Sequence, residues 1–317
     1  MKKRTIIALI AAAALIITGG ILLVLGLSFA GDSNGESKLV RQEITIQESF
    51  DTISVDTDDC DVKFAMFSGR DDCMVEVHSY ENVKHTAVVE DGTLKIQMVD
   101  QRNWTDHINI GWTESMEMTV YLPAAEYESL QIRTTTGDIR LAQEPFFREV
   151  VLRTSTGDIS CVTGVGGDVL DCMTSTGDIS VQNSTAIMLK LQSNTGDFAV
   201  SVVAGDEIYM KTDSGDVDAE NVNVQMFTCQ TDSGDVELEK VLAEDYLQVF
   251  TDSGDVEVGN SDAGTVNIET DTGDVSGNFL TPKWFQTYSN TGDVQVPHSR
   301  DGGECRIQTD SGDIHFK

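Results

Sequence analysis

The sequence predicts an all-β protein: a single-stranded parallel β-solenoid (β-helix) of about ten coils, with an N-terminal β cap and one transmembrane helix before it. Three observations predict this: a short motif with a fixed period, a constant apolar pattern around it, and one long uncharged run near the N-terminus. Thr251–Val256 shows the motif, and its Gly-Asp pairs lie 19 or 20 residues apart. Such a period is typical of a solenoid, whose coils bury their apolar faces only against one another. The glycines that mark the coils are Gly137, Gly157, Gly177, Gly196, Gly215, Gly234, Gly254, Gly273, Gly292 and Gly312.

Every coil has the same pattern when its glycine is counted as position zero. Positions −7 and −5 are almost always apolar, position +2 is always Ile, Val or Phe, and positions −3 and −1 are always Thr or Ser. Because side chains alternate along a strand, the odd positions before the glycine share one face, whereas after it the apolar positions are even. This change of phase predicts a structural corner at each Gly-Asp, where glycine tolerates the positive φ that a tight corner often needs. The hydroxyls at −3 and −1 should then point inward or into the corner.

Residues 130–317 form the predicted solenoid domain. Coils stacked at a strand spacing of ~4.8 Å give a rod of roughly 48 Å for ten coils. All coils run the same way round, so their strands must be parallel, and the rule for parallel crossovers favours a right-handed solenoid. The last coil in the sequence should form the frayed or capped end of the rod.

Residues 1–30 are the predicted cytoplasmic stub and transmembrane helix. The chain begins Met-Lys-Lys-Arg, and residues 5–30 carry no charge, which is long enough to cross a ~30 Å hydrocarbon core. The basic start places the N-terminus in the cytoplasm, so the protein should be a single-pass cell-membrane protein with its C-terminal domain extracytoplasmic. The alternative is a cleaved signal peptide, for which Ser28-Phe29-Ala30 resembles a cleavage site, although the apolar run is longer than usual. Residues 31–38 are rich in Gly and Ser and form a flexible linker.

Residues 39–129 form the predicted cap, which covers the open end of the core and sheet. The segment 50–62 fits the coil template with Cys60 in the place of the corner glycine, so it should be a degenerate first coil. Asp91-Gly92 predicts a hairpin turn. Alternating apolar residues predict strands at 75–78, 87–89, 94–98 and 116–122.

These features together resemble a known bacterial family. The basic start, the single span, the 50–62 pseudo-coil, the lead-in Tyr121–Leu130 and the Thr-x-Ser/Thr-Gly-Asp-Ile/Val coils are similar to the "putative adhesin" family of LiaG-like β-strand-repeat proteins. The resemblance implies an envelope-exposed repeat protein of unknown biochemical function, in some cases associated with envelope-stress operons. It brings no catalytic residues to this chain.

The aspartates that follow the corner glycines should form a column along the rod. Carboxylates stacked at strand spacing repel by ~1 kcal/mol per pair even in water, so something must offset this. One interpretation is hydrogen bonding from hydroxyls and turn amides. The other is a ladder of Ca²⁺ ions, because this cation prefers carboxylate and carbonyl oxygens. The candidate metal ligands are Asp216, Asp235, Asp255 and Asp274.

Other residues suggest weaker alternatives. The Thr-x-Thr/Ser rows suggest an ice-binding array, but the inward face predicted for them argues against it. Trp104 and Trp112 could stack on sugar rings, or plug the end of the core. Cys60 and Cys73 are the one pair considered for a disulfide. The remaining cysteines fall in core columns, and five scattered histidines form no metal or triad pattern.

The composition limits the function. A formal net charge of −32 argues against nucleic acid and against direct adsorption to anionic lipid. We expect no enzyme, since acidic residues are abundant without forming a recognisable site, and no cofactor, with Ca²⁺ left open. The expected function is a membrane-anchored scaffold or adhesin that presents the rod to an envelope protein or wall polymer. Two alternatives are an accessory or sensor subunit of an envelope-stress system and a Ca²⁺-dependent polysaccharide-binding protein.

Overall fold

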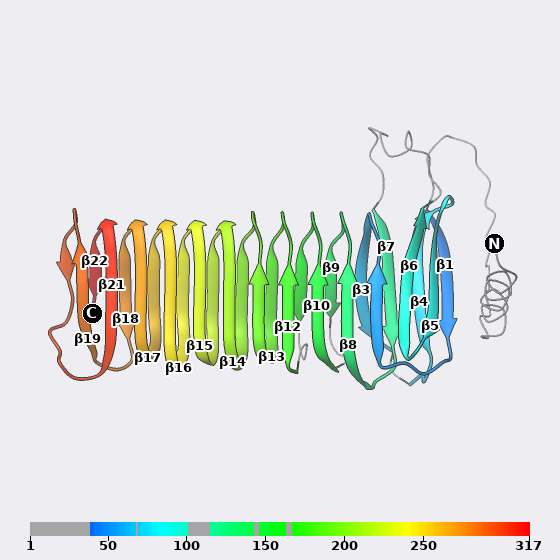
Figure 1. The fold of residues 1–317 in the computed structure, drawn as a ribbon, viewed down its shortest axis with the longest axis horizontal. Coiled ribbons are helices and arrows are strands. Elements are labelled where there is room, and N and C mark those ends of the chain that lie inside the picture. The colour runs from blue at the N-terminus through cyan, green and yellow to red at the C-terminus, as the bar shows by residue number, and fades with distance from the viewer. Residues whose placement is uncertain (1–38, 68, 101–114, 143–145, 163–166) are drawn as a thin grey trace, which may run out of the picture.

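The computed structural model describes residues 39–67, 69–100, 115–142, 146–162 and 167–317, and every element in these ranges is a β-strand. They form one long rod, with the cap at one end and the C-terminal coils at the other (Figure 1). The all-β solenoid predicted from the sequence is therefore confirmed. No helix in the described ranges has the length and apolarity needed to cross a membrane. The predicted transmembrane helix and linker, residues 1–38, lie outside the described residues.

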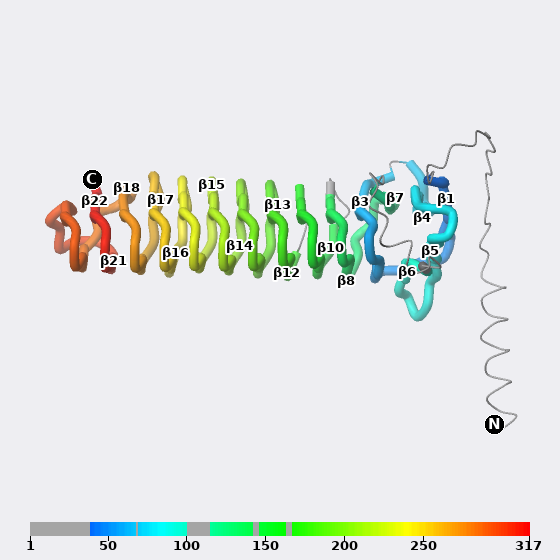
Figure 2. Tube along the Cα trace, turned by 90° about the horizontal axis from the view of Figure 1, so that it is seen from above, coloured from blue at the N-terminus to red at the C-terminus, as the bar shows by residue number. Residues whose placement is uncertain are grey.

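The solenoid strands pair in parallel and in register. Val217, for example, lies opposite Val236, which lies opposite Val256. In Figure 2 the coils follow one another like the turns of a flattened spring. The solenoid strands are β2 (Thr52–Asp56), β3 (Cys60–Met66), β8 (Glu126–Arg133), β9 (Ile139–Ala142), β10 (Phe146–Arg153), β11 (Ile159–Val162), β12 (Val169–Met173), β13 (Ile179–Gln192), β14 (Phe198–Ser214), β15 (Val217–Ser233), β16 (Val236–Ser253), β17 (Val256–Thr272), β18 (Val275–Phe279), β19 (Lys283–Ser289), β20 (Val294–Gln295), β21 (Gly303–Ser311) and β22 (Ile314–Phe316).

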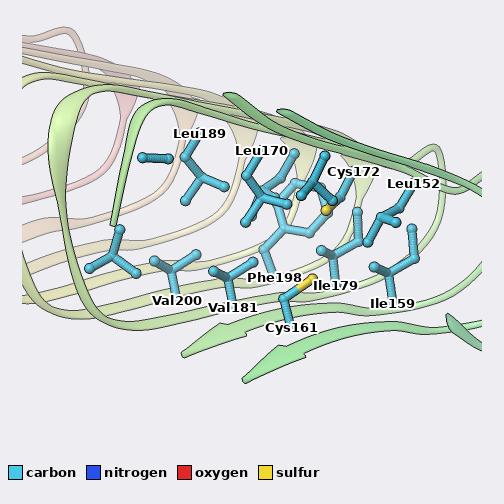
Figure 3. Close-up of a cluster of buried hydrophobic side chains, with 14 of the residues drawn as sticks. Leu152, Ile159, Cys161, Leu170, Cys172, Ile179, Val181, Leu189, Phe198 and Val200 are labelled. Atoms are coloured by element: carbon cyan, nitrogen blue, oxygen red, sulfur yellow. The ribbon is translucent and has the colours of Figure 1, made fainter. Parts of the chain in front are cut away.

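The core is made of the columns that the sequence pattern predicts. Leu152, Cys172 and Leu191 at −5 point toward Ile159 and Ile179 at +2, and the two rows close on each other inside the rod (Figure 3). All five of these side chains are buried. Because each coil adds the same apolar positions, the core is one continuous cluster along the rod.

The coils have a second corner that the sequence analysis did not predict. At position +6 the backbone turns through the left-handed region, and the next residue points back into the core, as Val203, Val222 and Val241 do. In the middle coils the predicted loose return is thus part of a long continuous strand, such as β15 or β16. The residues with positive φ at this corner are Asn183, Val202, Asn221, Lys240 and Asn260.

Val202→Asn is expected to stabilise the protein by about 1 kcal/mol. A β-branched residue at φ 55° is strained, whereas Asn tolerates this region, and the strain of a non-glycine residue there is roughly 1–2 kcal/mol. Val202 is 53% exposed, so little apolar burial is lost. The urea midpoint measures the effect. Ile187→Asn is the control, because Ile187 is equally exposed at 52% without a positive φ; equal shifts in both variants would contradict the strain argument.

The first coil is the predicted pseudo-coil. Ile53 in β2 lies opposite Leu130 in β8, and Val62 in β3 lies opposite Ile139 in β9. Cys60 occupies the corner, with its carbonyl beneath Gly137. A side chain is tolerated here because the layer before Cys60 is the cap strand that contains Met116, not another tight corner.

The cap is built from antiparallel strands that close the N-terminal end. β1 (Leu39–Ile46) and β7 (Met116–Leu122) flank β4 (Cys73–Tyr80), and β5 (Val83–Glu90) forms a hairpin with β6 (Thr93–Asp100). Asp91 and Gly92 turn this hairpin with φ of 51° and 78°, which confirms the predicted turn. The two outer strands are joined where the Gln42 side chain bonds the carbonyl oxygen of His85 at 2.9 Å.

The disulfide considered between Cys60 and Cys73 is wrong. Both are free, buried cysteines. Cys60 lies opposite Met116, whereas Met74, the neighbour of Cys73, lies opposite Tyr121. At the rise of a strand these positions of β7 are roughly 16 Å apart, and a disulfide needs Cα atoms within about 7 Å.

The last two coils are stacked out of sequence order, which corrects the prediction that the last coil forms the end. The coil of Gly312 (β21 and β22) packs directly on the coil of Gly273, and the coil of Gly292 (β19 and β20) packs outside it. Figure 2 shows the red final coil inside the outermost orange one. Three aromatic side chains close the core here, with Phe316 stacked on Phe279 at 5.2 Å and against Phe285 at 5.5 Å between ring centroids.

Candidate functional site

The corner glycines are needed because backbones stack on each other there. An ideal Cβ on Gly215 would lie 2.0 Å from the carbonyl oxygen of Gly196 in the coil beneath, and the same clash, at 1.9–2.3 Å, recurs at all ten corners. Only Gly157, Gly177 and Gly196 have φ in the positive region, at 150–157°. The predicted corner is present, but at most corners its physical reason is close stacking and not a positive φ.

Each aspartate of the corner column bonds the backbone of the next coil. Oδ1 of Asp216 accepts the N–H of Asp235 at 2.8 Å, and Oδ1 of Asp235 accepts the N–H of Asp255 at 2.8 Å. The series runs from Asp61 to Asp274, then through Asp313 to Asp293, in the stacking order of the coils. Hydrogen bonding to a carboxylate favours its charged form, so these bonds offset part of the repulsion along the column.

The hydroxyls at −3 form a second ladder inside the corner. Oγ1 of Thr231 donates to the carbonyl oxygen of Gly215 at 3.2 Å, and Oγ1 of Thr212 donates to that of Gly196 at 3.2 Å. These threonines are buried, as predicted. A buried hydroxyl without such a partner would cost about 1–3 kcal/mol.

The hydroxyls at −1 are exposed, and the prediction that they point inward is wrong. Thr156, Thr176 and Ser214 all lie on the surface. The strand phase changes two residues before the glycine, because −2 and −1 both face solvent at the corner. The argument used against an ice-binding array therefore holds for −3 only. The exposed −2 and −1 columns lie side by side on a corner and not on a flat sheet.

Beside the corner lies a flat acidic face on three neighbouring coils, which we call the acidic face. Asp218 lies opposite Glu237, and Glu237 lies opposite Glu257, in register on the outer side of the sheet. Partial burial, then the nearby charges of Asp216 and Asp197, raise the pKa of Asp218. Such a surface attracts cations and basic partners and repels anions. Its residues are Asp216, Asp218, Glu220, Asp235, Glu237, Glu239, Asp255 and Glu257.

The Ca²⁺ ligands predicted at Asp216, Asp235, Asp255 and Asp274 are spread along this column, one per coil. Each uses one oxygen on a backbone amide of the next coil. Within the described ranges, no three His, Cys, Asp or Glu side chains are grouped as metal ligands would be. The sequence analysis weighed hydrogen bonds against Ca²⁺, and the structure supplies the hydrogen bonds.

EDTA is therefore expected to leave the melting temperature within about 2 °C of a control matched in ionic strength, since the amide bonds need no cation. Differential scanning calorimetry with and without added Ca²⁺ measures this. A drop well beyond the control would show that Ca²⁺ is structural.

A pocket of about 410 Å³ lies near the C-terminal end and is lined by residues that include Asn223, Glu244, Asp262 and Lys283. Lys283 is only 3% exposed. Its ammonium forms an ion pair with Asp262 and donates to the carbonyl oxygen of Ala263 at 2.6 Å. Because its two charged groups are paired with each other, the pocket has little capacity left for a charged ligand. Trp104 and Trp112, the candidates for sugar stacking, lie outside the described residues.

This geometry defines a class of protein: a single-stranded parallel β-solenoid whose corners carry stacked glycines, a threonine ladder and an aspartate ladder. A family model described as Toastrack DUF4097 matches residues 50–208 and 200–317, and the chain belongs to this family. The resemblance to adhesin-like repeat proteins found from the sequence is confirmed.

Solved structures show the same fold at low identity. A "putative adhesin" from Parabacteroides distasonis ATCC 8503 is 15% identical, covers 89% of this chain and 98% of its own, and has a TM-score of 0.50. A "putative adhesin" from Bacteroides fragilis NCTC 9343 is 12% identical over 89% and 98%, with a TM-score of 0.47. A "putative lipid binding protein" from Parabacteroides distasonis is 17% identical over 79% and 99%, also with a TM-score of 0.47. No curated protein matches the chain.

Proposed function

We propose that the protein is a non-enzymatic scaffold or adhesin of the cell envelope. Residues 1–30 anchor it as a single-pass membrane protein, and the solenoid stands outside the membrane as a stiff rod. Its acidic face binds a basic envelope protein or a cationic group of a wall polymer. The observation that supports this proposal is the in-register acidic face on three stacked coils, which a partner meets as one fixed surface.

A cell-attachment assay tests the proposal. The variant Asp218→Asn, Glu237→Gln, Glu257→Gln neutralises the centre of the acidic face and is expected to reduce attachment at least about tenfold, an effect that salt should mimic. The matched control neutralises three exposed acids near the other end of the rod, Glu126, Glu128 and Glu149. Unchanged attachment in the acidic-face variant would contradict the proposal.

The alternative is an accessory or sensor subunit of an envelope-stress system, which the family resemblance suggests. A stress reporter measured in the same strains separates the two. Loss of attachment with unchanged reporter output supports the adhesin, and the reverse result supports the accessory subunit. Attachment that is lost on adding EDTA would instead support Ca²⁺-dependent binding of a polysaccharide.

A further inference from the structure

The C-terminal end of the rod leaves core positions uncovered. Position +2 is at most 1% exposed in nine coils, but in the outermost coil its Val294 is 45% exposed. Leu280, in the segment that leads into this coil, is 59% exposed. These side chains occupy the same columns that the next coil buries everywhere else in the rod, so this end lacks a covering layer.

The same end has an unpaired strand edge. β19 pairs with β21 on one side, and within the described part of the chain no strand pairs with its other side. Its exposed side chains include Trp284 and Tyr288, and its one charged residue, Lys283, is buried. Natural proteins usually protect such edges with exposed charges or cover them. β19 has no exposed charge, so its free N–H and C=O groups are available to another strand.

Charge decides where two copies of this acidic chain can meet. Residues 213–274 contain 17 acidic residues and one basic residue, Lys240. Residues 275–317 contain five acidic and four basic residues. The flanks of two rods therefore repel each other, whereas their C-terminal ends are nearly neutral. The opposite end is closed by the cap, where Gln42 bonds the backbone of His85.

We infer that the protein associates tail to tail with a second copy of itself through its outermost coil. The two β19 edges pair antiparallel about a twofold axis, and Leu280 and Val294 of each copy are buried against the other. A twofold contact uses the same surface on both copies and closes after two, so the rods form dimers and not fibres. This inference concerns the chain alone and holds whether or not the proposed envelope function is correct.

The size of the end face indicates the strength of the contact. Seven residues of β19 span roughly 23 Å, and the two walls of the coil are ~10 Å apart. The area covered is of the order of 500 Å² per copy once side chains are included, near the lower limit of specific interfaces. We therefore expect a dissociation constant in the micromolar range, on the order of 1–50 µM.

The first experiment measures the mass of the full chain in detergent between about 1 and 100 µM, by sedimentation with correction for bound detergent. The wild type is expected to shift from monomer to dimer. Val294→Glu places an unpaired charge in the contact and should weaken dimerisation at least about 100-fold. Ile187→Glu, a similarly exposed apolar residue far from this end, should leave it unchanged.

The second experiment uses cysteine cross-linking, which reports the geometry directly. Gln286→Cys, in β19, is expected to give a disulfide-linked dimer on oxidation. Gln131→Cys is the matched control, because it has the same residue type and the same column position at the other end of the solenoid, and it should not cross-link. Both positions are exposed, and the six native cysteines are buried.

Three outcomes would overturn the inference. The first is a wild-type chain that stays monomeric at 100 µM. The second is a dimer that Val294→Glu leaves intact, because the contact then lies elsewhere. The third is equal cross-linking at Gln286→Cys and Gln131→Cys. If β19 became protected from amide exchange only on addition of another envelope protein, the end would belong to that protein and not to a second copy.

Discussion

Gly215→Ala is expected to destabilise the protein by about 3 kcal/mol or more. The new Cβ would lie 2.0 Å from the carbonyl oxygen and 2.6 Å from the carbonyl carbon of Gly196. Both are backbone atoms held in a ladder, so the coils must separate locally, and overpacking of this kind costs at least 1–3 kcal/mol. Separation also lengthens the neighbouring ladder bonds, such as that from Thr231 to Gly215.

Urea denaturation measures this loss, and amide exchange shows whether protection is lost first around the altered corner. Two controls isolate the cause. Gly69→Ala meets no atom within 4 Å but has φ of 85°, so it should cost only about 1 kcal/mol through backbone strain. Ser214→Ala, an exposed neighbour in the same corner, should be close to neutral. If Gly215→Ala costs no more than Gly69→Ala, the close stacking is not what requires glycine.

Asp262→Ala is expected to cost about 3 kcal/mol and to release the outermost coil. The Lys283 side chain is 2% exposed, and its ammonium would keep only the carbonyl oxygen of Ala263 and the hydroxyl of Thr281, at 2.6 and 3.2 Å. Removing one partner of a buried ion pair typically costs 3–5 kcal/mol, because the other charge stays buried. Lys283 begins β19, so amide exchange should speed up in the outermost coil before the rest of the rod.

A surface ion pair of the same chain is the control. Lys63 and Glu117 are 2.8 Å apart, with side chains 35% and 44% exposed. Glu117→Ala should therefore cost less than about 1 kcal/mol. Equal losses in the two variants would mean that Lys283 reaches water in solution.

Much of the solenoid was predictable because each coil is nearly a copy of the last. A residue type that recurs at one offset over ten coils fixes which side chains face the core, and the +2 column and the −3 threonines lie where this pattern places them. The corner at +6 was missed, although Asn183, Asn221 and Asn260 occur there in three coils, and Asn is common in the left-handed region. The −1 hydroxyls were misplaced because strict alternation was extended through a corner where it stops.

The exchange of the last two coils was not predictable for the same reason. Coils with equivalent columns fit each other in either order, so a local pattern does not encode which one lies outermost. The order here is associated with particular side chains: Lys283 reaches Asp262 across the inserted coil, and Phe279 stacks on Phe316. The acidic face was visible as charge in the sequence, but its flat register needed the strand pairing.

The hydrogen bonds between coils point along the rod. A force that pulls the two ends apart therefore loads the rungs one after another, like a zip, and not all together in shear. Each coil that yields would free 19 or 20 residues of chain, roughly 65 Å of extended length in place of ~4.8 Å of rod. A molecule held at both ends would then lengthen in equal steps under tension, which suits a tether that must absorb a pull without breaking.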